Sequence, residues 1–275
     1  MMTRSMRNQQ KKISLKSKMP PVSRILMRIG GKTPIRDLIK NYAPSDFGIY
    51  IEPFVGSGVI YFHMNLDDDV KAVINDLDPE LIEAHKIIKS NPSIKNISQY
   101  EKMTPAQTEY LVNEKKITTK LDKLARYIAY SSGGFSGKSK ARKDGTYALY
   151  NFSDISAKLR RIPALAEYMK NTTVLNQDYK SVIRKYDRAD AFIYLDPPYE
   201  NSDGLYEFPD MDYEEMAREL SKVKGKFLMS LNDSPNIRKV FKQFKIRKVL
   251  VPGGSYGNKK SIGKGVRNEL FISNY

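Results

Sequence analysis

The sequence predicts an α/β protein whose doubly wound sheet is interrupted by an inserted, mostly helical region. Short apolar strands alternate with helix-like segments in both halves of the chain, and a polar, lysine-rich stretch breaks this alternation in the middle. We therefore expect three parts. They are a basic, disordered arm at residues 1–22, a sheet-forming domain at residues 23–91 and 171–275, and the insertion at residues 92–170.

The first half of the chain supplies two strands, each followed by a helix. Residues 48–54 have the pattern of a buried strand that runs into a glycine-containing turn at residues 55–58, after which an apolar helix begins. Residues 70–76 form the next strand. Asp78 and Pro79 then have the pattern of an N-cap followed by proline at the first helical position, which predicts the start of a second helix.

The insertion and the second half follow from the same patterns. Helices are expected near residues 121–130 and around Lys158, Arg160 and Arg161, with a glycine-serine loop at residues 131–143 between them. The alternation then resumes. Strands are expected near residues 173–175, 191–195, 226–231, 246–251 and 269–273, and helices near 180–186, 213–222 and shortly after Ser234.

Composition excludes several kinds of chemistry. The chain has no cysteine, so disulfides, thiolate zinc sites and cysteine nucleophiles are absent. His63 and His85 are the two histidines, and both fall in helix-like segments where a packed or exposed histidine is the ordinary explanation. No stretch approaches the about 20 apolar residues of a membrane span, and the first residues lack the apolar run of a secretory signal. We expect a soluble, cytoplasmic protein without membrane attachment.

The net charge of +16 predicts a polyanionic partner, because a basic surface neutralises phosphates and releases condensed counterions. Residues 1–36 contain ten Lys or Arg and no acidic residue. A solvated arm is the simplest explanation for the start of this segment, although such an arm can still touch nucleic acid. A membrane tether is less favoured, since no amphipathic helix or lipidation signal accompanies the charge.

A glycine turn and a later carboxylate together predict a site for a nucleoside-type cofactor. Gly56 and Gly58 let backbone approach a ligand closely, and Asp76 ends the next strand, where a carboxylate can bind both hydroxyls of a ribose. Either feature alone is more simply a tight turn or a capping aspartate. Tyr61 stands at the third glycine position of the dinucleotide fingerprint, so a cofactor without a pyrophosphate fits better than NAD or FAD.

The most specific feature is Asp196-Pro197-Pro198-Tyr199, directly after an apolar strand. The prolines remove two backbone donors, which leaves carbonyl acceptors beside the Asp196 carboxylate. Two acceptors that bind the hydrogens of an aromatic amine favour a pyramidal nitrogen, whose lone pair can attack a methyl sulfonium in line. Tyr199 offers a flat face for a stacked base. The ordinary alternative is a proline-rich turn with a capping aspartate, and methylation at carbon 5 of cytosine is excluded because it needs a cysteine.

In this order the motifs resemble the Dam-type family of adenine-specific DNA methyltransferases, over most of residues 24–275. Residues 28–32 resemble the family's W-A-G-G-K motif, residues 51–58 its E-P-F-x-G-x-G loop, and residues 75–82 its N-D-x-N-x-x-L-I segment. Residues 196–199 resemble its catalytic tetrad, and residues 267–275 resemble its last strand. The resemblance implies a Rossmann-like methyltransferase sheet. It also implies transfer of a methyl group from S-adenosylmethionine to adenine N6, S-adenosylhomocysteine as product, and no metal.

The resemblance assigns roles to individual residues. Asp196, Pro197, Pro198 and Tyr199 would be catalytic. The cofactor pocket would be lined by Arg28, Lys32, Phe54, Gly56, Gly58, Asp76, Asp178 and Asp196. Two positions depart from the family's pattern, since Arg28 stands where an aromatic residue is usual and Gln177 where glycine is usual. An arginine beside a sulfonium cation is unfavourable unless its charge points at solvent or DNA.

The insertion matches the family's target-recognition region in position. The resemblance implies double-stranded DNA as the partner, with the target adenine flipped out of the duplex, and no obligate protein partner is evident. The expected DNA-contacting residues are Arg126, Phe135, Lys138, Lys140, Arg142 and Lys143. Phe135 or Tyr147 is a candidate wedge or stacking residue, and packing under a loop is the alternative for both. The insertion lacks the hairpin sequence expected of enzymes that read GATC, so no target sequence is predicted.

Other functions remain open from sequence alone. An RNA adenine methyltransferase or a protein amide methyltransferase would keep the fold and change the substrate, although the basic insertion disfavours a protein substrate. A nucleic-acid-binding relative without catalysis is disfavoured by the intact Asp196, Tyr199, Asp76 and glycine turn. A nicotinamide oxidoreductase is disfavoured by the missing third glycine.

Overall fold

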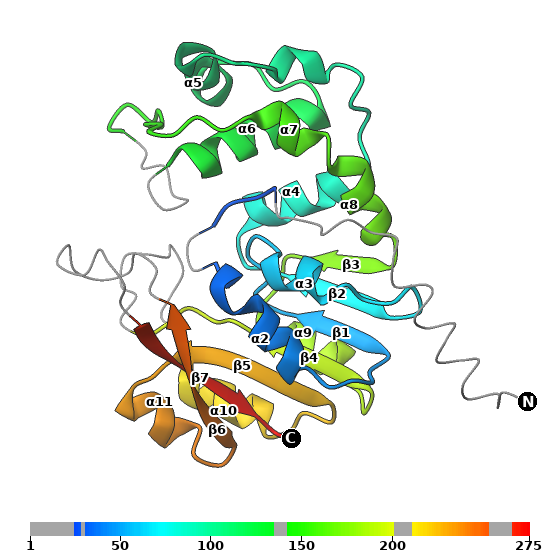
Figure 1. Cartoon of the computed structure of the whole chain (residues 1–275), viewed down its shortest axis with the longest axis vertical. Coiled ribbons are helices and arrows are strands. Elements are labelled where there is room, and N and C mark those ends of the chain that lie inside the picture. The colour runs from blue at the N-terminus through cyan, green and yellow to red at the C-terminus, as the bar shows by residue number, and fades with distance from the viewer. Residues whose placement is uncertain (1–24, 29–30, 135–141, 201–210, 253–265) are drawn as a thin grey trace, which may run out of the picture.

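A computed structural model describes residues 25–28, 31–134, 142–200, 211–252 and 266–275. In this part of the chain seven strands form one sheet in the order β3-β2-β1-β4-β5-β7-β6 (Figure 1). The strands are β1 (Ile49–Glu52), β2 (Lys71–Asn75), β3 (Thr172–Leu175), β4 (Ala191–Leu195), β5 (Lys226–Asn232), β6 (Lys245–Pro252) and β7 (Val266–Ser273). Strands β1 to β5 run parallel, and β7 is antiparallel to both of its neighbours.

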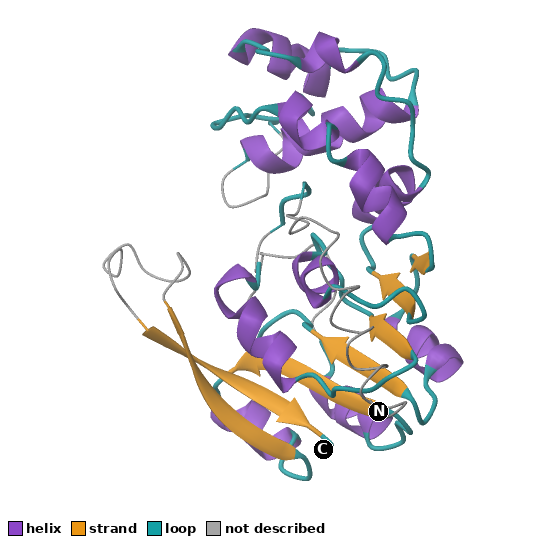
Figure 2. Cartoon of the chain, turned by 45° about the vertical axis from the view of Figure 1, so that its right-hand side comes forward, coloured by secondary structure: helices purple, strands orange, loops and turns teal. Residues whose placement is uncertain are grey.

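Helices cover both faces of the sheet, which confirms the predicted doubly wound architecture (Figure 2). One layer contains α2 (Arg36–Tyr42), α3 (Val59–Met64) and α4 (Pro79–Lys89), and the other contains α9 (Tyr179–Tyr186), α10 (Tyr213–Leu220) and α11 (Pro235–Val240). Successive residues of a strand enter different cores: Tyr50 and Phe192 pack into the first, and Ile51 and Ile193 into the second. Burial of both faces explains why β1 and β4 read as continuous apolar runs.

The insertion lies beyond the β3 edge of the sheet and is helical in its described parts (Figure 1). Its elements are η2 (Ile97–Tyr100), α5 (Pro105–Asn113), α6 (Lys120–Gly133), α7 (Ile155–Leu159) and α8 (Ile162–Tyr168). Helix α6 packs against α4 through one apolar face that includes Leu124 and Ile128.

The sequence predicts most of these elements, and the differences lie in the helices: η1 and η2 were not predicted, and α6 continues to Gly133, into the loop expected from residue 131. Each expected strand is present, and Asp78 caps α4 by accepting hydrogen bonds from the backbone N–H of Glu80 and Leu81, at 3.0 and 3.1 Å. Helices α2 and α5 were not predicted. The single helix expected around Lys158 is two helices: Arg160 is the C-cap of α7 and Arg161 the N-cap of α8, whose second residue is a proline that cannot continue a preceding helix. The proposed arm at residues 1–22 lies outside the described residues.

The Asn75 side chain ties together loops that follow three adjacent strands. Its amide nitrogen donates to the carbonyls of Pro53 and Gln177, each at 2.9 Å, and its oxygen accepts from the Gln177 backbone N–H, also at 2.9 Å. Asn75 is 1% exposed, so its amide nitrogen and oxygen depend on these partners in place of water. One buried side chain therefore fixes the carboxyl ends of β1, β2 and β3 relative to one another.

Asn75→Leu should lower the free energy of unfolding by about 1–3 kcal/mol, because it leaves the buried Pro53 carbonyl without this partner and removes both bonds to Gln177. Urea-induced unfolding measures this change. Asn171→Leu is the matched control, since Asn171 is exposed and donates one hydrogen bond, to the Asp68 carbonyl at 2.8 Å. Equal losses of stability in the two variants would contradict the role given to Asn75.

Candidate active site

The predicted motifs converge at one edge of the sheet, where β2, β1 and β4 end side by side. The glycine turn follows β1, Asp76 follows β2 and Asp196 follows β4. Lys32 reaches the same edge from the N-cap of the short helix η1 (Thr33–Ile35). The carboxyl edge of parallel strands is where open α/β sheets bind their ligands, so the topology accounts for the convergence.

Asp196 is held by a buried lysine. The Lys32 Nζ lies 2.5 Å from Asp196 Oδ1 and 4.5 Å from the centre of the Tyr199 ring, and the Lys32 side chain is 4% exposed. The Ser230 hydroxyl donates to the same carboxylate oxygen at 3.4 Å. Burial raises the pKa of Asp196, Lys32 opposes this shift, and the nearby Glu269 adds to it. The positive charge of Lys32 thus favours the ionised form of Asp196.

Two proline carbonyls follow Asp196 in the chain. The Tyr213 hydroxyl donates to the Pro198 carbonyl at 2.6 Å, which ties the motif to α10. The Pro197 carbonyl is the other proline acceptor, directly after Asp196 in the chain. The Asp196 carboxylate and the Pro197 oxygen are thus two neighbouring acceptors at the end of β4.

The glycine turn is held against Asp76. Gly56 and Gly58 have φ angles of +51° and +77°, a region that favours glycine. The Gly56 N–H donates to Asp76 Oδ2 at 3.0 Å, and the Asp78 N–H donates to Oδ1 at 3.1 Å. Burial raises the pKa of Asp76, and Arg28 is the strongest of the groups that oppose the shift.

Arg28 directs its charge at carboxylates. Its guanidinium forms a close ion pair with Asp78 and lies 3.9 Å from Asp76 Oδ1. The sequence-based expectation was that this charge would need to point at solvent or DNA beside a cationic ligand. In the structure the charge points at protein instead, where two carboxylates at the end of β2 neutralise it.

Several residues at this edge were missed by sequence reasoning. Glu52 ends β1, is buried, and accepts a hydrogen bond from the Tyr50 hydroxyl at 2.6 Å; burial raises its pKa well above the usual range. Leu77 is 46% exposed between Asp76 and Asp78. Tyr179 packs on Phe54, with ring centres 5.4 Å apart. The sequence carried a signal for two of them: Glu52 is a carboxylate in an apolar strand, and Leu77 is an apolar residue between two aspartates.

Asp178 does not join the group around Asp196. It follows β3, which β2 and β1 separate from β4 in the sheet. Its exposed carboxylate caps α9 by accepting from the Lys180 N–H at 2.9 Å. No group of three or more metal-ligating side chains is present in the described parts of the chain.

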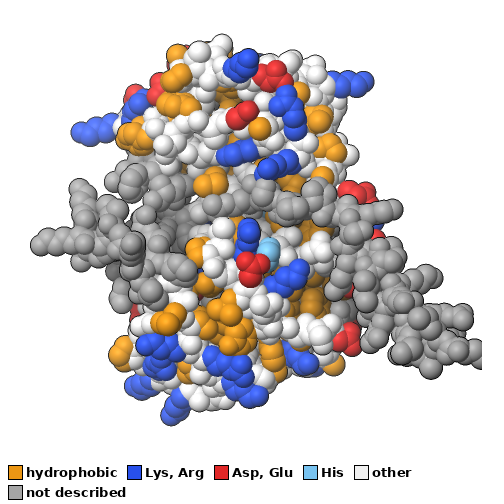
Figure 3. Space-filling model, viewed as in Figure 1, with side chains coloured by type: hydrophobic (Ala, Val, Ile, Leu, Met, Phe, Trp, Pro, Cys, Tyr) orange, Lys and Arg blue, Asp and Glu red, His pale blue; other side chains and the backbone are white. Residues whose placement is uncertain are grey.

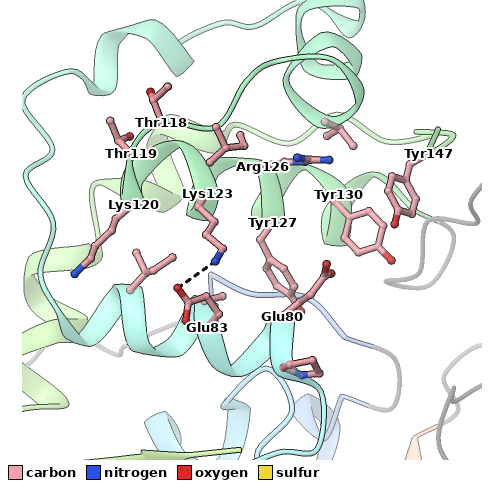
Figure 4. Close-up of a pocket in the computed structure, with 15 residues that line it drawn as sticks. Glu80, Glu83, Thr118, Thr119, Lys120, Lys123, Arg126, Tyr127, Tyr130 and Tyr147 are labelled. Carbon is pink, nitrogen blue, oxygen red and sulfur yellow. Dashed lines mark hydrogen bonds and ion pairs between the residues drawn. The ribbon is translucent and has the colours of Figure 1, made fainter. Parts of the chain in front are cut away.

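A groove of about 830 Å³ lies between α4 of the sheet domain and α6 of the insertion (Figure 4). Helix α6 contributes Arg126, Tyr127 and Tyr130, and the Tyr147 ring contacts that of Tyr130, with centres 4.6 Å apart. The Lys123 ammonium pairs with Glu83 across the groove at 3.2 Å. The structure assigns Arg126 neither a hydrogen bond nor an ion pair with any described residue, and Figure 4 shows its side chain extending toward Tyr130 and Tyr147.

The other predicted DNA-contacting residues are placed only in part. Arg142 is exposed, lies 4.0 Å from Glu109 and donates to the Thr146 hydroxyl at 3.4 Å. Lys143 is exposed. Phe135, Lys138 and Lys140 lie outside the described residues. On the face shown in Figure 3, Lys and Arg side chains gather over the helical insertion at the top and again over the lower part of the molecule.

The chain is similar to known proteins over most of its length. A family model described as D12 class N6 adenine-specific DNA methyltransferase matches residues 29–250. The chain is 26% identical over 271 residues to the Type II methyltransferase M1.LlaDCHI of Lactococcus lactis subsp. cremoris, which covers 90% of this chain and 93% of that protein. It is 26% identical over 227 residues to the Type II methyltransferase M.CviBI of Paramecium bursaria Chlorella virus NC1A, with coverage of 77% and 84%. It is 25% identical over 203 residues to the DNA adenine methylase of Haemophilus influenzae, with coverage of 69% and 68%.

Lys32→Met should raise the pKa of Asp196 further, because the substitution removes the positive charge that opposes the effect of burial. Lys32→Arg keeps the charge and should leave this pKa near its wild-type value. The carbon-13 resonance of the Asp196 carboxyl, followed by NMR as a function of pH, measures the shift. A pKa in Lys32→Met that is unchanged or lower would contradict the pairing.

Proposed function

The chain belongs to the D12 class N6 adenine-specific DNA methyltransferases, and from this premise we propose that the carboxyl edge of its sheet holds S-adenosylmethionine and the target amine together. The protein is a DNA adenine methyltransferase. The observation that carries the proposal is the position of Asp196, paired with Lys32 beside the Pro197 carbonyl at the edge where the glycine turn and Asp76 also end.

The residues at this edge fit S-adenosylmethionine. The turn at Gly56 leaves open space, since a Cβ there would meet only the Arg28 side chain, at 3.8 Å. Asp76 offers a carboxylate for ribose hydroxyls, and the exposed Leu77 and the Phe54 ring offer apolar contacts for a purine. The buried Glu52 and the partly buried Asp196 favour a cation nearby, as a sulfonium is. When bound, the cofactor supplies a methyl group activated for in-line displacement.

Lys32 and Arg28 contribute to this pocket through their positive charges. Lys32 lowers the pKa of Asp196 against the effect of burial, and Arg28 does the same for Asp76. We infer that both act by supporting carboxylates, in place of a direct contact with the sulfonium, because like charges repel. Gly58 lets α3 begin close to the turn, since a Cβ there would clash with Phe62 at 2.8 Å. Asp178 contributes by fixing the loop after β3.

The target amine is proposed to bind two acceptors. The Asp196 carboxylate and the Pro197 carbonyl accept its two hydrogens, which favours a pyramidal nitrogen with a lone pair available for attack. The proton that the amine loses can pass to an Asp196 carboxylate oxygen. Burial raises the pKa of Asp196, and a higher pKa makes its carboxylate a better proton acceptor. Pro198 contributes by its rigid φ and by its bond to Tyr213.

Tyr199 is proposed to stack on the target base. Lys32 lies over its ring, so one face is in contact with the ammonium and the other is the candidate stacking surface. An amino group that must reach this buried edge cannot do so from within a stacked duplex. We therefore propose that the substrate is double-stranded DNA whose adenine is flipped out of the helix.

The insertion is proposed to contact the DNA. Arg126 is the best-supported residue, because it lines the groove between α4 and α6 and has no described partner for its charge. Arg142 and Lys143 are exposed nearby in sequence, and Lys138, Lys140 and Phe135 complete the proposed set. Tyr147 lines the same groove and is a stacking candidate. The names of the Type II relatives support a place in restriction–modification, and a DNA substrate supports action in the cytoplasm.

The structure has no helix, among the described residues, that is long and apolar enough to cross a membrane.

Asp196→Ala should lower the single-turnover rate of methyl transfer to DNA by about 10²–10⁴-fold, because it removes an acceptor for the target amine. Asp190→Ala is the control, since Asp190 lies just before the same strand at its other end and is exposed. This control should retain activity within about twofold. Transfer of labelled methyl groups measures the rates, and circular dichroism checks the fold. A folded Asp196→Ala variant with full activity would refute the assignment.

Arg126→Ala should weaken binding to duplex DNA and reduce the slope of log affinity against log salt concentration by about 1. Fluorescence anisotropy at several salt concentrations measures both quantities. Arg218→Ala is the control, because Arg218 is exposed on α10, in the layer on the other face of the sheet. An unchanged slope for Arg126→Ala would remove the groove from the DNA interface.

A further inference from the structure

His85 lies beneath the glycine turn and contacts it directly. The residue belongs to α4, is 0% exposed, and places its Nε2 2.9 Å from the Gly56 carbonyl oxygen. A carbonyl can only accept, so Nε2 carries the proton and donates it. The imidazole packs against Phe62, with ring centres 6.5 Å apart, and its Cε1 would lie 3.3 Å from a Cβ added to Gly58. His85 therefore supports both glycines of the turn.

The His85 ring is neutral, and only one of its two nitrogens has a hydrogen-bond partner among the described residues. Within the described structure its Nδ1 is buried and has no hydrogen-bond partner. Burial lowers the pKa of His85 to about 4, so the neutral form with the proton on Nε2 is present near neutral pH. A buried polar atom without a partner is unfavourable, and an apolar side chain would avoid this. The hydrogen bond from Nε2 is the feature that an apolar side chain would lack.

Gly56 is thereby held on both sides of its left-handed backbone position. The peptide before it donates through the Gly56 N–H to Asp76 Oδ2 at 3.0 Å, and the peptide after it accepts from His85 at 2.9 Å. Gly56 has φ of +51° between these two bonds. One bond orients each of the two peptides that flank this glycine, so together they fix the path of the turn.

We propose that His85 is a positioning residue for the cofactor, which sets the affinity for S-adenosylmethionine by holding the Gly56 peptide in its bound orientation. This rests on the proposed function, in which the glycine turn lines the cofactor pocket. Preorganisation of a loop raises affinity by removing the cost of ordering it on binding. The effect acts on cofactor affinity and leaves the acceptors for the target amine, Asp196 and Pro197, in place.

A matched pair of variants separates the hydrogen bond from packing. His85→Gln keeps a side-chain N–H that can reach the Gly56 carbonyl, and His85→Met fills similar space without a donor. Loss of one hydrogen bond should raise the KM for S-adenosylmethionine and the Kd for S-adenosylhomocysteine in His85→Met by about tenfold, with kcat within about twofold. His85→Gln should recover most of this loss. Calorimetric titration and steady-state kinetics measure these constants, and thermal unfolding without cofactor reports on packing.

Equal cofactor affinity in His85→Met and the wild type would overturn the inference, as would equal losses in both variants that follow their thermal stability. If neither variant folds, nitrogen-15 NMR of the wild-type imidazole decides, and a ring that carries its proton on Nδ1 or titrates between about pH 5.5 and 8 overturns it. Failure of the wild-type protein to bind S-adenosylhomocysteine would instead reject the proposed cofactor pocket. The two failures are thus distinguishable.

Discussion

The site depends on four carboxylates gathered at one edge of one sheet, three of them buried and the fourth, Asp196, with its side chain 20% exposed. Glu52 ends β1, Asp76 follows β2 and Asp196 follows β4, while the antiparallel β7 brings Glu269 opposite Asn232, at the end of β5. Buried carboxylates are costly unless they are paired or hydrogen-bonded. A tyrosine, two backbone amides, an arginine and a lysine supply contacts of the first three. Carboxylates gathered at this edge suit a cationic cofactor, and their pairing with Lys32 and Arg28 reconciles these two basic residues with a sulfonium.

Helix α4 connects this edge to the insertion. Its N-terminus is capped by Asp78, which also pairs with Arg28, and His85 in its second turn supports the glycine turn. Its other side lines the groove with α6, where Glu83 meets Lys123. The insertion enters directly after this helix, so the element that shapes the proposed cofactor pocket also forms one wall of the proposed DNA-contacting groove.

The sequence predicts most of the fold because its signals are local. Apolar strands, the Asp78–Pro79 helix start and the Asp196 motif are each readable within a few residues, and the structure confirms the elements they predict. The pairings of Lys32 with Asp196 and of Arg28 with Asp78 join segments far apart in the chain, and no local pattern gives side-chain geometry. For the same reason the role of His85 was not foreseen. The helix break at Arg160 was missed although Pro163 gave a local signal.

Identification of the methylated nucleoside tests the central claim most directly. Purified protein is incubated with S-adenosylmethionine labelled in its methyl group and with unmethylated duplex DNA or RNA, and the product is digested to nucleosides. The account predicts label in N6-methyladenine from duplex DNA. Label confined to RNA, or found on cytosine, would contradict it.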